Sequence, residues 1–436
     1  MAPFKFQAQI VCCCIQAASP DGFFAAFFPG KKARILPAPI AFAHPAAHPL
    51  FSRVIRWSEG GFLMGKYKVC VYAICKNESK FAARWMESMG EADAVYVLDT
   101  GSEDGTPEAL RALGAQVTEE VITPWRFDTA RNRSLALVPS DADICVCTDL
   151  DEVFSPGWRA QLEAAWQPGT QRAQYKYVWS FQPDGREGIV FYSDKIHARQ
   201  GARWVHPVHE VLRFEGGEPA SVLVPGMQLN HHPDPEKSRA QYLPLLEMAV
   251  AEDPEDDRNM HYLGREYLFR GRWEDCIRTL RRHLALPRAT WPDERCASYR
   301  YMARAYGETG DALGQERCLL MAAGEAPHLR EPWLDLARLA YARQDWPGLM
   351  ACCHRALRIT QRPRTYITEA ASFGPLPWDL LSIACWHLGL RQEALSAVEQ
   401  ALALSPQDAR LQANRALMAQ KKTSPGACAP EAEEVY

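Results

Sequence analysis

Three carboxylates follow an apolar stretch in the first half of the chain. Asp149, Asp151 and Glu152 come directly after residues 143–148. Residues i and i+2 of an extended segment point the same way, so Asp149 and Asp151 can approach one site together. Mg²⁺ and Mn²⁺ prefer oxygen ligands and are commonly held by one or two carboxylates plus substrate phosphates. The pattern predicts a metal site formed by Asp149 and Asp151, although three adjacent carboxylates leave the choice of direct ligand open.

Two earlier apolar runs also end in polar side chains. Asn77 and Glu78 follow residues 68–75, and Asp99 and Asp104 follow residues 94–98. An isolated Asp-x-Asp is common on protein surfaces, but here it belongs to a series of strand ends that carry carboxylates. For Asp99 and Asp104 the alternative is turn and helix-cap chemistry, which Asp-Gly-Thr before a helix ordinarily provides.

The elements that must position these groups alternate between strands and helices. Apolar, β-branched runs predict strands over 68–75, 94–98, 116–121 and 143–148, and helical patterns over 79–89, 106–113 and 128–137 lie between them. This alternation predicts βαβ units around a parallel sheet. Ligands of such sheets bind outside the carboxyl ends of the strands, where the polar residues lie.

Four blocks in this order resemble the family-2 glycosyltransferases with a GT-A fold. They are VYAICKNE, VLDTGSEDGT, FDTARNRSL and CTDLDEVF, and the resemblance extends from about Lys66 to His232. It implies an α/β nucleotide-sugar-binding domain, a uridine or guanosine diphosphate sugar as donor, and Mn²⁺ or Mg²⁺ as cofactor. By this resemblance Asp151 would bind the metal, with Asp149 assisting through ribose or water. The metal would neutralise the leaving diphosphate as a Lewis acid.

The resemblance also implies roles for the residues of the nucleotide pocket. Asp99 would contact the base or ribose, while Asp104, Asn77 and Glu78 would complete the pocket. Arg131 would approach the base or diphosphate, since a guanidinium can bond two oxygens at once. The alternative for Arg131 is a solvated helix face.

A base is expected further along, in the short strand-like segment WVHPVHEV at 204–211. Transfer with inversion needs a group that takes the acceptor's proton while positive charge develops at the donor carbon. Glu210 is the first candidate and His209 the second. The alternative is a partly buried strand in which the histidines are only hydrogen-bonded.

A pair of histidines follows the last apolar run, 221–229. Related enzymes often place a histidine here that adds a ligand to the metal or touches the diphosphate, and either His231 or His232 fits that role. The alternative is an interdomain hinge, because Pro233 and Pro235 lead into the next helix.

From residue 257 the pattern is helical and repetitive. Four units in one register start near Asp257, Cys296, Arg330 and Pro375. Each has a small residue at its eighth position, namely Gly264, Ala303, Ala337 and Ser382. They resemble the tetratricopeptide repeat, whose period is 34 residues. Such repeats form concave surfaces suited to peptides or helices. We expect them to hold the acceptor, to position the protein on a partner, or to join two copies as a homodimer.

Composition narrows the class of protein. The chain has 436 residues, a formal net charge of −4 and 47% hydrophobic residues, so no bulk positive field attracts nucleic acid. The 14 cysteines are scattered and fall at apolar positions, as free buried thiols do in a reducing compartment. No stretch predicts a transmembrane segment. These features favour a cytoplasmic protein.

Four segments follow from these patterns. We expect a poorly ordered N-terminal extension over 1–63, with Met64 as the true start, a GT-A domain over 64–235, a repeat domain over 236–420 and a disordered tail over 421–436. The hypothesis is an inverting, metal-dependent glycosyltransferase that acts on a peptide or protein, or on a cell-surface saccharide precursor. The alternatives are an interaction protein with a degenerate sugar-nucleotide domain, and a nucleotidyltransferase, which would carry a Gly-rich phosphate loop in place of residues 75–78.

Overall fold

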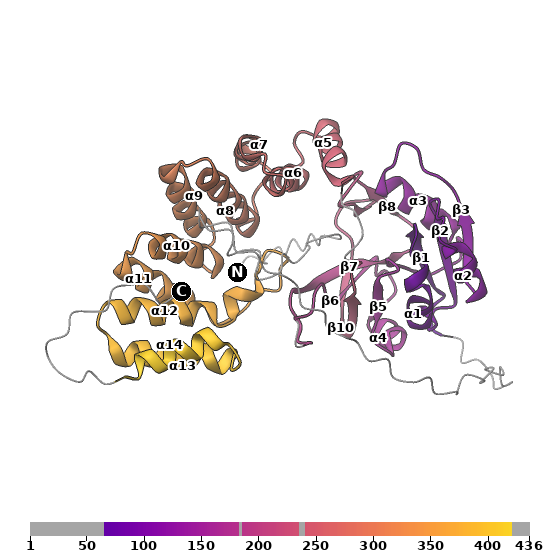
Figure 1. The fold of residues 1–436 in the computed structure, drawn as a ribbon. Coiled ribbons are helices and arrows are strands. Elements are labelled where there is room, and N and C mark those ends of the chain that lie inside the picture. The colour runs from indigo at the N-terminus through magenta and orange to yellow at the C-terminus, as the bar shows by residue number, and fades with distance from the viewer. Residues whose placement is uncertain (1–64, 183–184, 235–239, 421–436) are drawn as a thin grey trace.

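A computed structural model describes residues 65–182, 185–234 and 240–420 in two regions (Figure 1). The expected extension over 1–63 and the expected tail over 421–436 lie outside the described residues. The first region is a sheet with helices packed on it, and the second is a run of helices. The predicted fold class, an α/β domain followed by an all-α repeat region, is confirmed.

The sheet has eight strands in the order β3-β2-β1-β4-β7-β6-β10-β5. The first four, β1 (Val69–Cys75), β2 (Ala94–Asp99), β3 (Gln116–Glu119) and β4 (Ile144–Cys147), are parallel as expected. The others are β5 (Glu152–Phe154), β6 (Arg172–Val178), β7 (Val190–Ala198) and β10 (Ser221–His231). Strand β7 is antiparallel to β4 and β6, and β10 is antiparallel to β5. Strand β10 runs parallel to β6, so the sheet beyond β4 is mixed and the expectation of a parallel sheet is wrong there. Strands β6 and β7 are antiparallel because no crossover helix separates them.

Four helices pack on the sheet. They are α1 (Ser79–Met89), α2 (Thr106–Ala112), α3 (Phe127–Leu137) and α4 (Trp158–Ala165). Helix α3 lies against β1 and β2, α1 against β5, and α4 against β10. Every residue of β1 is buried, which explains why its sequence is apolar throughout rather than alternating.

A separate ribbon pairs β8 (Ala202–Val205) with β9 (Val211–Phe214). The connecting residues 206–210 contain His209 and Glu210, so the expectation that these two lie in a strand-like segment is wrong. His206 and His209 have φ values of 79° and 52°. That left-handed conformation is incompatible with a strand and uncommon for residues other than glycine.

The second region begins with α5 (Tyr242–Glu252) and continues as helix pairs. The pairs are α6 (Asp257–Phe269) with α7 (Trp273–Ala285), α8 (Pro292–Glu308) with α9 (Ala312–Glu325), α10 (Glu331–Ala342) with α11 (Trp346–Leu357), and α12 (Leu376–His387) with α13 (Arg391–Leu404). A short helix η3 (Ala370–Phe373) precedes α12, and α14 (Ala409–Met418) follows α13. The units expected from the sequence coincide with these pairs, although α8 starts upstream of Cys296.

Close packing within the first pair explains why the eighth repeat position is small. A Cβ atom added to Gly264 would lie 2.3 Å from Leu280 of the partner helix. Ala303, Ala337 and Ser382 occupy the same position in the later units and are all buried. Only small side chains let two helices approach this closely.

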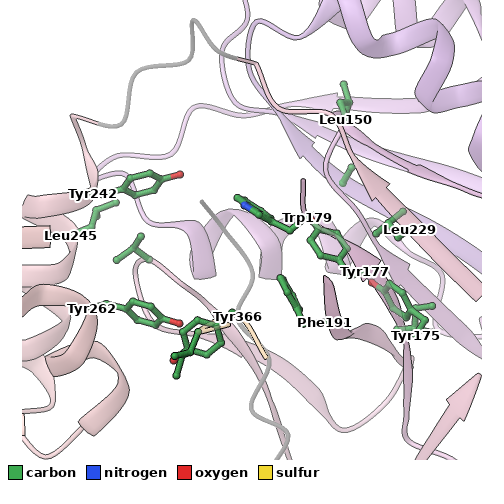
Figure 2. Packing of buried hydrophobic residues seen from close by; sticks show 14 of the residues in the cluster. Leu150, Tyr175, Tyr177, Trp179, Phe191, Leu229, Tyr242, Leu245, Tyr262 and Tyr366 are labelled. Atoms are coloured by element: carbon green, nitrogen blue, oxygen red, sulfur yellow. The ribbon is translucent and has the colours of Figure 1, made fainter. Parts of the chain in front are cut away.

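One buried hydrophobic cluster continues from the sheet region into the helices. It contains Trp179 and Phe191 from the first region and Tyr242, Tyr262 and Tyr366 from the second (Figure 2). The two regions therefore share part of their core. Of the helices that the structure describes, none has the length and apolar character needed to cross a bilayer.

The cysteines in the described residues are unpaired thiols, and nearly all are buried. Cys70 of β1 lies opposite Cys145 of β4 in the sheet register. Burial raises the pKa of both thiols, that of Cys145 to about 12. Here the cysteines act as small apolar side chains, as the sequence indicated.

Candidate active site

The loops after β1 and β2 are joined by hydrogen bonds. The Asn77 side-chain oxygen accepts from the Glu103 backbone N–H at 2.7 Å, and the Asn77 N–H donates to Ser102 Oγ at 2.8 Å. The N–H of Glu78, a buried residue, donates to Thr106 Oγ1 at 2.8 Å. Asn77 has a φ of 55°, a conformation that asparagine tolerates better than most residues. Asn77 and Glu78 thus lie where the sequence predicted, at the carboxyl end of β1.

The Asp99 carboxylate is buried under the second of these loops. Its Oδ1 accepts from the N–H groups of Gly101 and Ser102 at 2.9 and 2.8 Å, and its Oδ2 accepts from the Ser102 hydroxyl. Asp99 is only 1% exposed. These bonds match the turn chemistry considered from the sequence.

The Asp104 carboxylate accepts hydrogen bonds from the first residue of α1 and the first residue of α2. Its Oδ2 accepts from the Ser79 N–H at 3.0 Å, and its Oδ1 accepts from the Thr106 N–H at 3.1 Å. Burial disfavours the charged form, but the hydrogen bonds from Thr106 and Ser79 outweigh that effect and lower the pKa of Asp104 to about 2. Asp104 remains exposed. Contact between a nucleotide and this loop pair stays a prediction.

Arg131 joins the metal motif to the predicted base. Its Nη2 donates to Asp149 Oδ1 and its Nε donates to Glu210 Oε1, both at 2.7 Å. The guanidinium also lies 5.4 Å from the Trp204 ring, and the side chain is only 1% exposed. Arg131 thus lies on neither a solvated helix face nor an open surface for a nucleotide. It bridges two carboxylates inside the domain.

Lys195 of β7 is a second buried cation at this site. Its Nζ donates to Asp149 Oδ2 at 3.1 Å and to Glu152 Oε1 at 3.2 Å. Burial opposes ionisation of Asp149, but Arg131 and Lys195 beside it hold the pKa of that carboxyl well below its usual range. Asp149 is therefore a fixed negative charge, 22% exposed, with cations on both oxygens.

Glu152 is a structural neighbour rather than an open ligand. Its Oε2 accepts from the Asp149 N–H at 2.9 Å, and its Oε1 accepts from the Tyr177 hydroxyl at 2.8 Å. Burial raises the pKa of Glu152 despite Lys195. Of the three adjacent carboxylates, Asp151 alone lacks an arginine or lysine bonded to it among the described residues.

Asp151 faces His231 across the β5–β10 edge of the sheet. Asp151 Oδ2 and His231 Nε2 lie 3.5 Å apart, while His231 Nδ1 lies 3.0 Å from the Trp179 carbonyl oxygen. The ring stacks on Trp179 with centroids 4.1 Å apart. Burial alone would lower the pKa of His231, but its bond to Asp151 and the charges around it raise that pKa.

His232 has a different environment. Its ring stacks on Phe181 with centroids 5.8 Å apart, and its backbone N–H donates to the Asp151 carbonyl at 2.8 Å. The structure therefore brings the ring of His231 to the Asp151 carboxylate and places the ring of His232 against Phe181.

The residues present fit a divalent cation bound in part by substrate. A carboxylate oxygen and an imidazole nitrogen 3.5 Å apart can both approach one ion at ordinary ligand distances. Within the described parts of the chain, no group of three or more His, Cys, Asp or Glu side chains has the arrangement of a metal site. Mg²⁺ and Mn²⁺ often take their remaining ligands from phosphates and water. The pair Asp151 and His231 meets that description.

Glu210 lies in the loop between β8 and β9, and its two carboxylate oxygens have different surroundings. Oε1 accepts from Arg131, whereas Oε2 has no hydrogen-bond partner among the described residues and is buried. The neighbouring His209 ring is packed between Tyr262 and Tyr242, with centroids 4.2 and 5.9 Å away. The two base candidates therefore have different surroundings: Glu210 accepts a hydrogen bond from Arg131, whereas the His209 ring packs against two tyrosine rings.

Comparison with known proteins identifies the first region. Residues 70–225 match the family described as glycosyl transferase family 2. This chain contains a family 2 glycosyltransferase domain. The matched segment extends from β1 to the middle of β10 and includes Asp99, Arg131, Asp149, Asp151 and Glu210.

Further similarities concern one curated protein and several solved structures. A TPR repeat-containing protein of Synechococcus elongatus is 27% identical over 158 residues, or 35% of this chain and 36% of that protein. The chain thus spans about a third of the length of this curated relative. The crystal structure of MamA covers 38% of this chain and 89% of its own, at 15% identity and a TM-score of 0.31. The match to the crystal structure of yeast Tom70 covers 42% of this chain and 36% of the Tom70 chain, at 13% identity and a TM-score of 0.32.

The helix pairs of the second region thus follow the family 2 glycosyltransferase domain in one chain. Their assignment as tetratricopeptide-like depends on the helix pairs and small-residue positions described above.

Sequence reasoning missed two residues of the glycosyltransferase domain's site. Lys195 belongs to a strand in which Phe191, Ser193, Lys195 and His197 are all buried. A lysine in a buried alternating position of a strand is a signal that it has a charged partner. Trp179, which stacks on His231, follows directly after β6, but nothing in its local sequence indicates which ring it would meet.

Proposed function

We propose that the protein is an inverting glycosyltransferase that uses a nucleoside diphosphate sugar and a divalent cation. The observation that carries the proposal is the Arg131 bridge, which fixes Glu210 within one side chain of the Asp149 motif. A buried carboxylate with a free oxygen lies on one side of Arg131. On the other side of Arg131 lies Asp149, and two residues further along the chain is Asp151, which faces His231.

Asp151 and His231 would hold the cation. Bound there with the donor's diphosphate, Mn²⁺ or Mg²⁺ would supply charge neutralisation for the departing nucleotide. Asp149 stays ionised between Arg131 and Lys195. Its carboxylate would orient the donor's ribose or a metal-bound water rather than coordinate the ion directly, because both of its oxygens already have cationic partners.

Glu210 would act as the base. Arg131 orients its Oε1, so Oε2 is the atom that would take the acceptor's proton as the acceptor bonds to the donor carbon and the bond from that carbon to the diphosphate breaks. His209 would position its neighbour, because its ring is packed between two tyrosines. The donor class, a uridine or guanosine diphosphate sugar, is part of the proposal.

The repeat region would present the acceptor. Stacked helix pairs provide a long surface beside the glycosyltransferase domain (Figure 1). Such surfaces suit extended peptides, so a peptide or protein acceptor is proposed first and a saccharide precursor second.

The test is a panel of uridine and guanosine diphosphate sugars assayed for hydrolysis with Mn²⁺. Glu210→Gln keeps the size and one hydrogen bond of the side chain but removes its basicity, so turnover should fall by about 10²-fold or more. UDP and GDP affinity, measured by calorimetry, should be unchanged. Asp151→Asn should remove the dependence on Mn²⁺ with little loss of stability.

Glu215→Gln provides the matched control, because Glu215 is an exposed glutamate just after β9. Its turnover should equal that of the wild type. Normal turnover in Glu210→Gln would remove Glu210 from the mechanism, and normal Mn²⁺ dependence in Asp151→Asn would remove the metal assignment. A collapse in His209→Gln alone would transfer the role of base to the histidine.

A further inference from the structure

The loop that carries Glu210 has a backbone that needs external support. His206 and His209 both adopt left-handed φ values, 79° and 52°. Such conformations cost free energy for residues other than glycine and persist where surrounding contacts fix them. The supporting contacts therefore decide where Glu210 lies.

Helix α6, the first helix of the repeat pairs, supplies polar contacts to this loop. Arg258 Nη1 donates to the His209 carbonyl oxygen, and Asn259 Nδ2 lies 3.0 Å from His206 Nδ1. Asp256, the residue before the helix, lies 3.4 Å from His206 Nε2. Both left-handed residues are thus held by side chains of the helical region.

Tyr262 of the same helix supplies the apolar contact. Its ring stacks on the His209 ring at 4.2 Å and is fully buried. The guanidinium groups of Arg258 and Arg265 lie 5.3 and 4.5 Å from the centre of the Tyr262 ring. These contacts fix the ring on which His209 rests. Figure 2 shows Tyr262 with Tyr242 and Tyr366 in the cluster shared by the two regions.

The same junction also fixes the helix that carries Arg131. Phe127, the first residue of α3, donates its N–H to the Pro207 carbonyl at 2.9 Å. Its ring stacks on Tyr242 of α5 at 6.2 Å, and Arg126 pairs with Glu252 at the end of α5. Both partners of the ion pair between Arg131 and Glu210 are therefore held from the helical side.

We propose that α5 and α6 are part of the catalytic centre, with Tyr262 and Arg258 as positioning residues for Glu210. The inference depends on the proposed role of Glu210 as base. Catalytic competence of the glycosyltransferase domain then depends on the first repeat unit, whatever the later repeats bind.

The test uses full-length protein and the substitution Tyr262→Leu, which keeps an apolar side chain but removes the ring. Amide hydrogen exchange of residues 204–214 should accelerate by about tenfold or more as the loop opens. Mn²⁺-dependent hydrolysis of UDP-glucose and GDP-mannose should lose kcat with KM and nucleotide affinity unchanged. Tyr262→Phe keeps the stacked ring and should restore both exchange and kcat.

Tyr306→Leu is the matched control, because Tyr306 is a buried tyrosine of α8 hydrogen-bonded to Arg281. It should leave exchange of residues 204–214 at the wild-type rate. If Tyr262→Leu does not fold, Asn259→Ala removes a single loop contact and should still accelerate exchange several-fold. Unchanged loop exchange in the folded variants would overturn the inference.

The two proposals fail in different ways. Normal hydrolysis by Glu210→Gln, together with accelerated exchange in Tyr262→Leu, would overturn the role of Glu210 and with it the catalytic meaning of the junction. Loss of hydrolysis in Glu210→Gln with wild-type loop exchange and wild-type kcat in Tyr262→Leu would overturn only the positioning role.

Discussion

Two groups of carboxylates in the glycosyltransferase domain are satisfied by different partners. Asp99 and Asp104 accept hydrogen bonds from backbone N–H groups and hydroxyls of the segments that follow β1 and β2. Asp149 and Glu210 instead share the guanidinium of Arg131. The hydrogen bonds to Asp99 and Asp104 fix the conformation of two turns. The bonds of Arg131 bring two carboxylates and a guanidinium together in a buried place.

The two groups of carboxylates are therefore expected to differ in purpose. Asp99 and Asp104 stabilise the fold, whereas Asp149 and Glu210 are expected to take part in catalysis. Backbone donors are fixed by the chain, so the turn carboxylates have little freedom to exchange partners for a substrate. The side chains of Arg131 and Lys195 hold Asp149 in its charged form. We therefore expect changes in the first group to affect stability modestly, and changes in the second to affect stability and catalysis together.

The largest effect should come from Arg131→Met. The substitution leaves Asp149 and Glu210 without their shared cation in a buried site, and breaking a buried ion pair costs about 3–5 kcal/mol. Urea denaturation would measure the free energy of unfolding. Arg133→Met on the same helix is the control. The Arg133 side chain is 63% exposed, and its ion pair with Glu120, at 3.6 Å, is long and lies at the surface. The free energy of unfolding should therefore change by less than about 0.5 kcal/mol. Equal stability of the two variants would show that the buried network contributes nothing.

A smaller loss should follow from Asp99→Ala. The N–H groups of Gly101 and Ser102 lose their acceptor, and unsatisfied donors of this kind cost about 1–3 kcal/mol. The same denaturation experiment applies. Glu103→Ala in the same loop changes only an exposed side chain and should be neutral. If Asp99→Ala were also neutral, the loop would not depend on this carboxylate for its stability.

The smallest effect concerns the pH dependence of Asp104. Hydrogen bonds lower its folded pKa to about 2 from the usual 3.8, so its stabilising contribution is present above pH 4 and is lost as pH falls toward 2. Because Asp104 is largely exposed, we expect that contribution to be only about 1 kcal/mol. The stability difference between wild type and Asp104→Asn should shrink between pH 5 and pH 2.5. A difference that stays constant over this range would contradict the assignment.

The sequence predicted the local elements well because they depend on local patterns. The first helix, over 79–89, matches α1, and the strands β1 to β4 lie within a few residues of their expected ends. The repeat units were found because small residues recur in one register. These signals need no knowledge of distant contacts.

The rest depends on pairings between distant segments. Sequence could not tell whether the ring of His231 or that of His232 lies beside Asp151. That placement depends on the antiparallel pairing of β10 with β5, which puts His231 opposite Glu152. The loop conformation at 206–210 depends on α6, which lies about fifty residues further along the chain. Neither contact leaves a periodic signal near the residues concerned.

The buried thiols of the sheet can report how often the glycosyltransferase domain unfolds locally. Only the thiolate reacts with disulfide reagents, and the raised pKa values of Cys70, Cys75 and Cys145 keep these groups protonated while their strands are intact. Their labelling therefore requires opening of β1 or β4, and its rate reports how often the centre of the sheet opens. In an oxidising medium the same thiols would become reactive each time the sheet unfolds, and they would then form disulfides that block refolding.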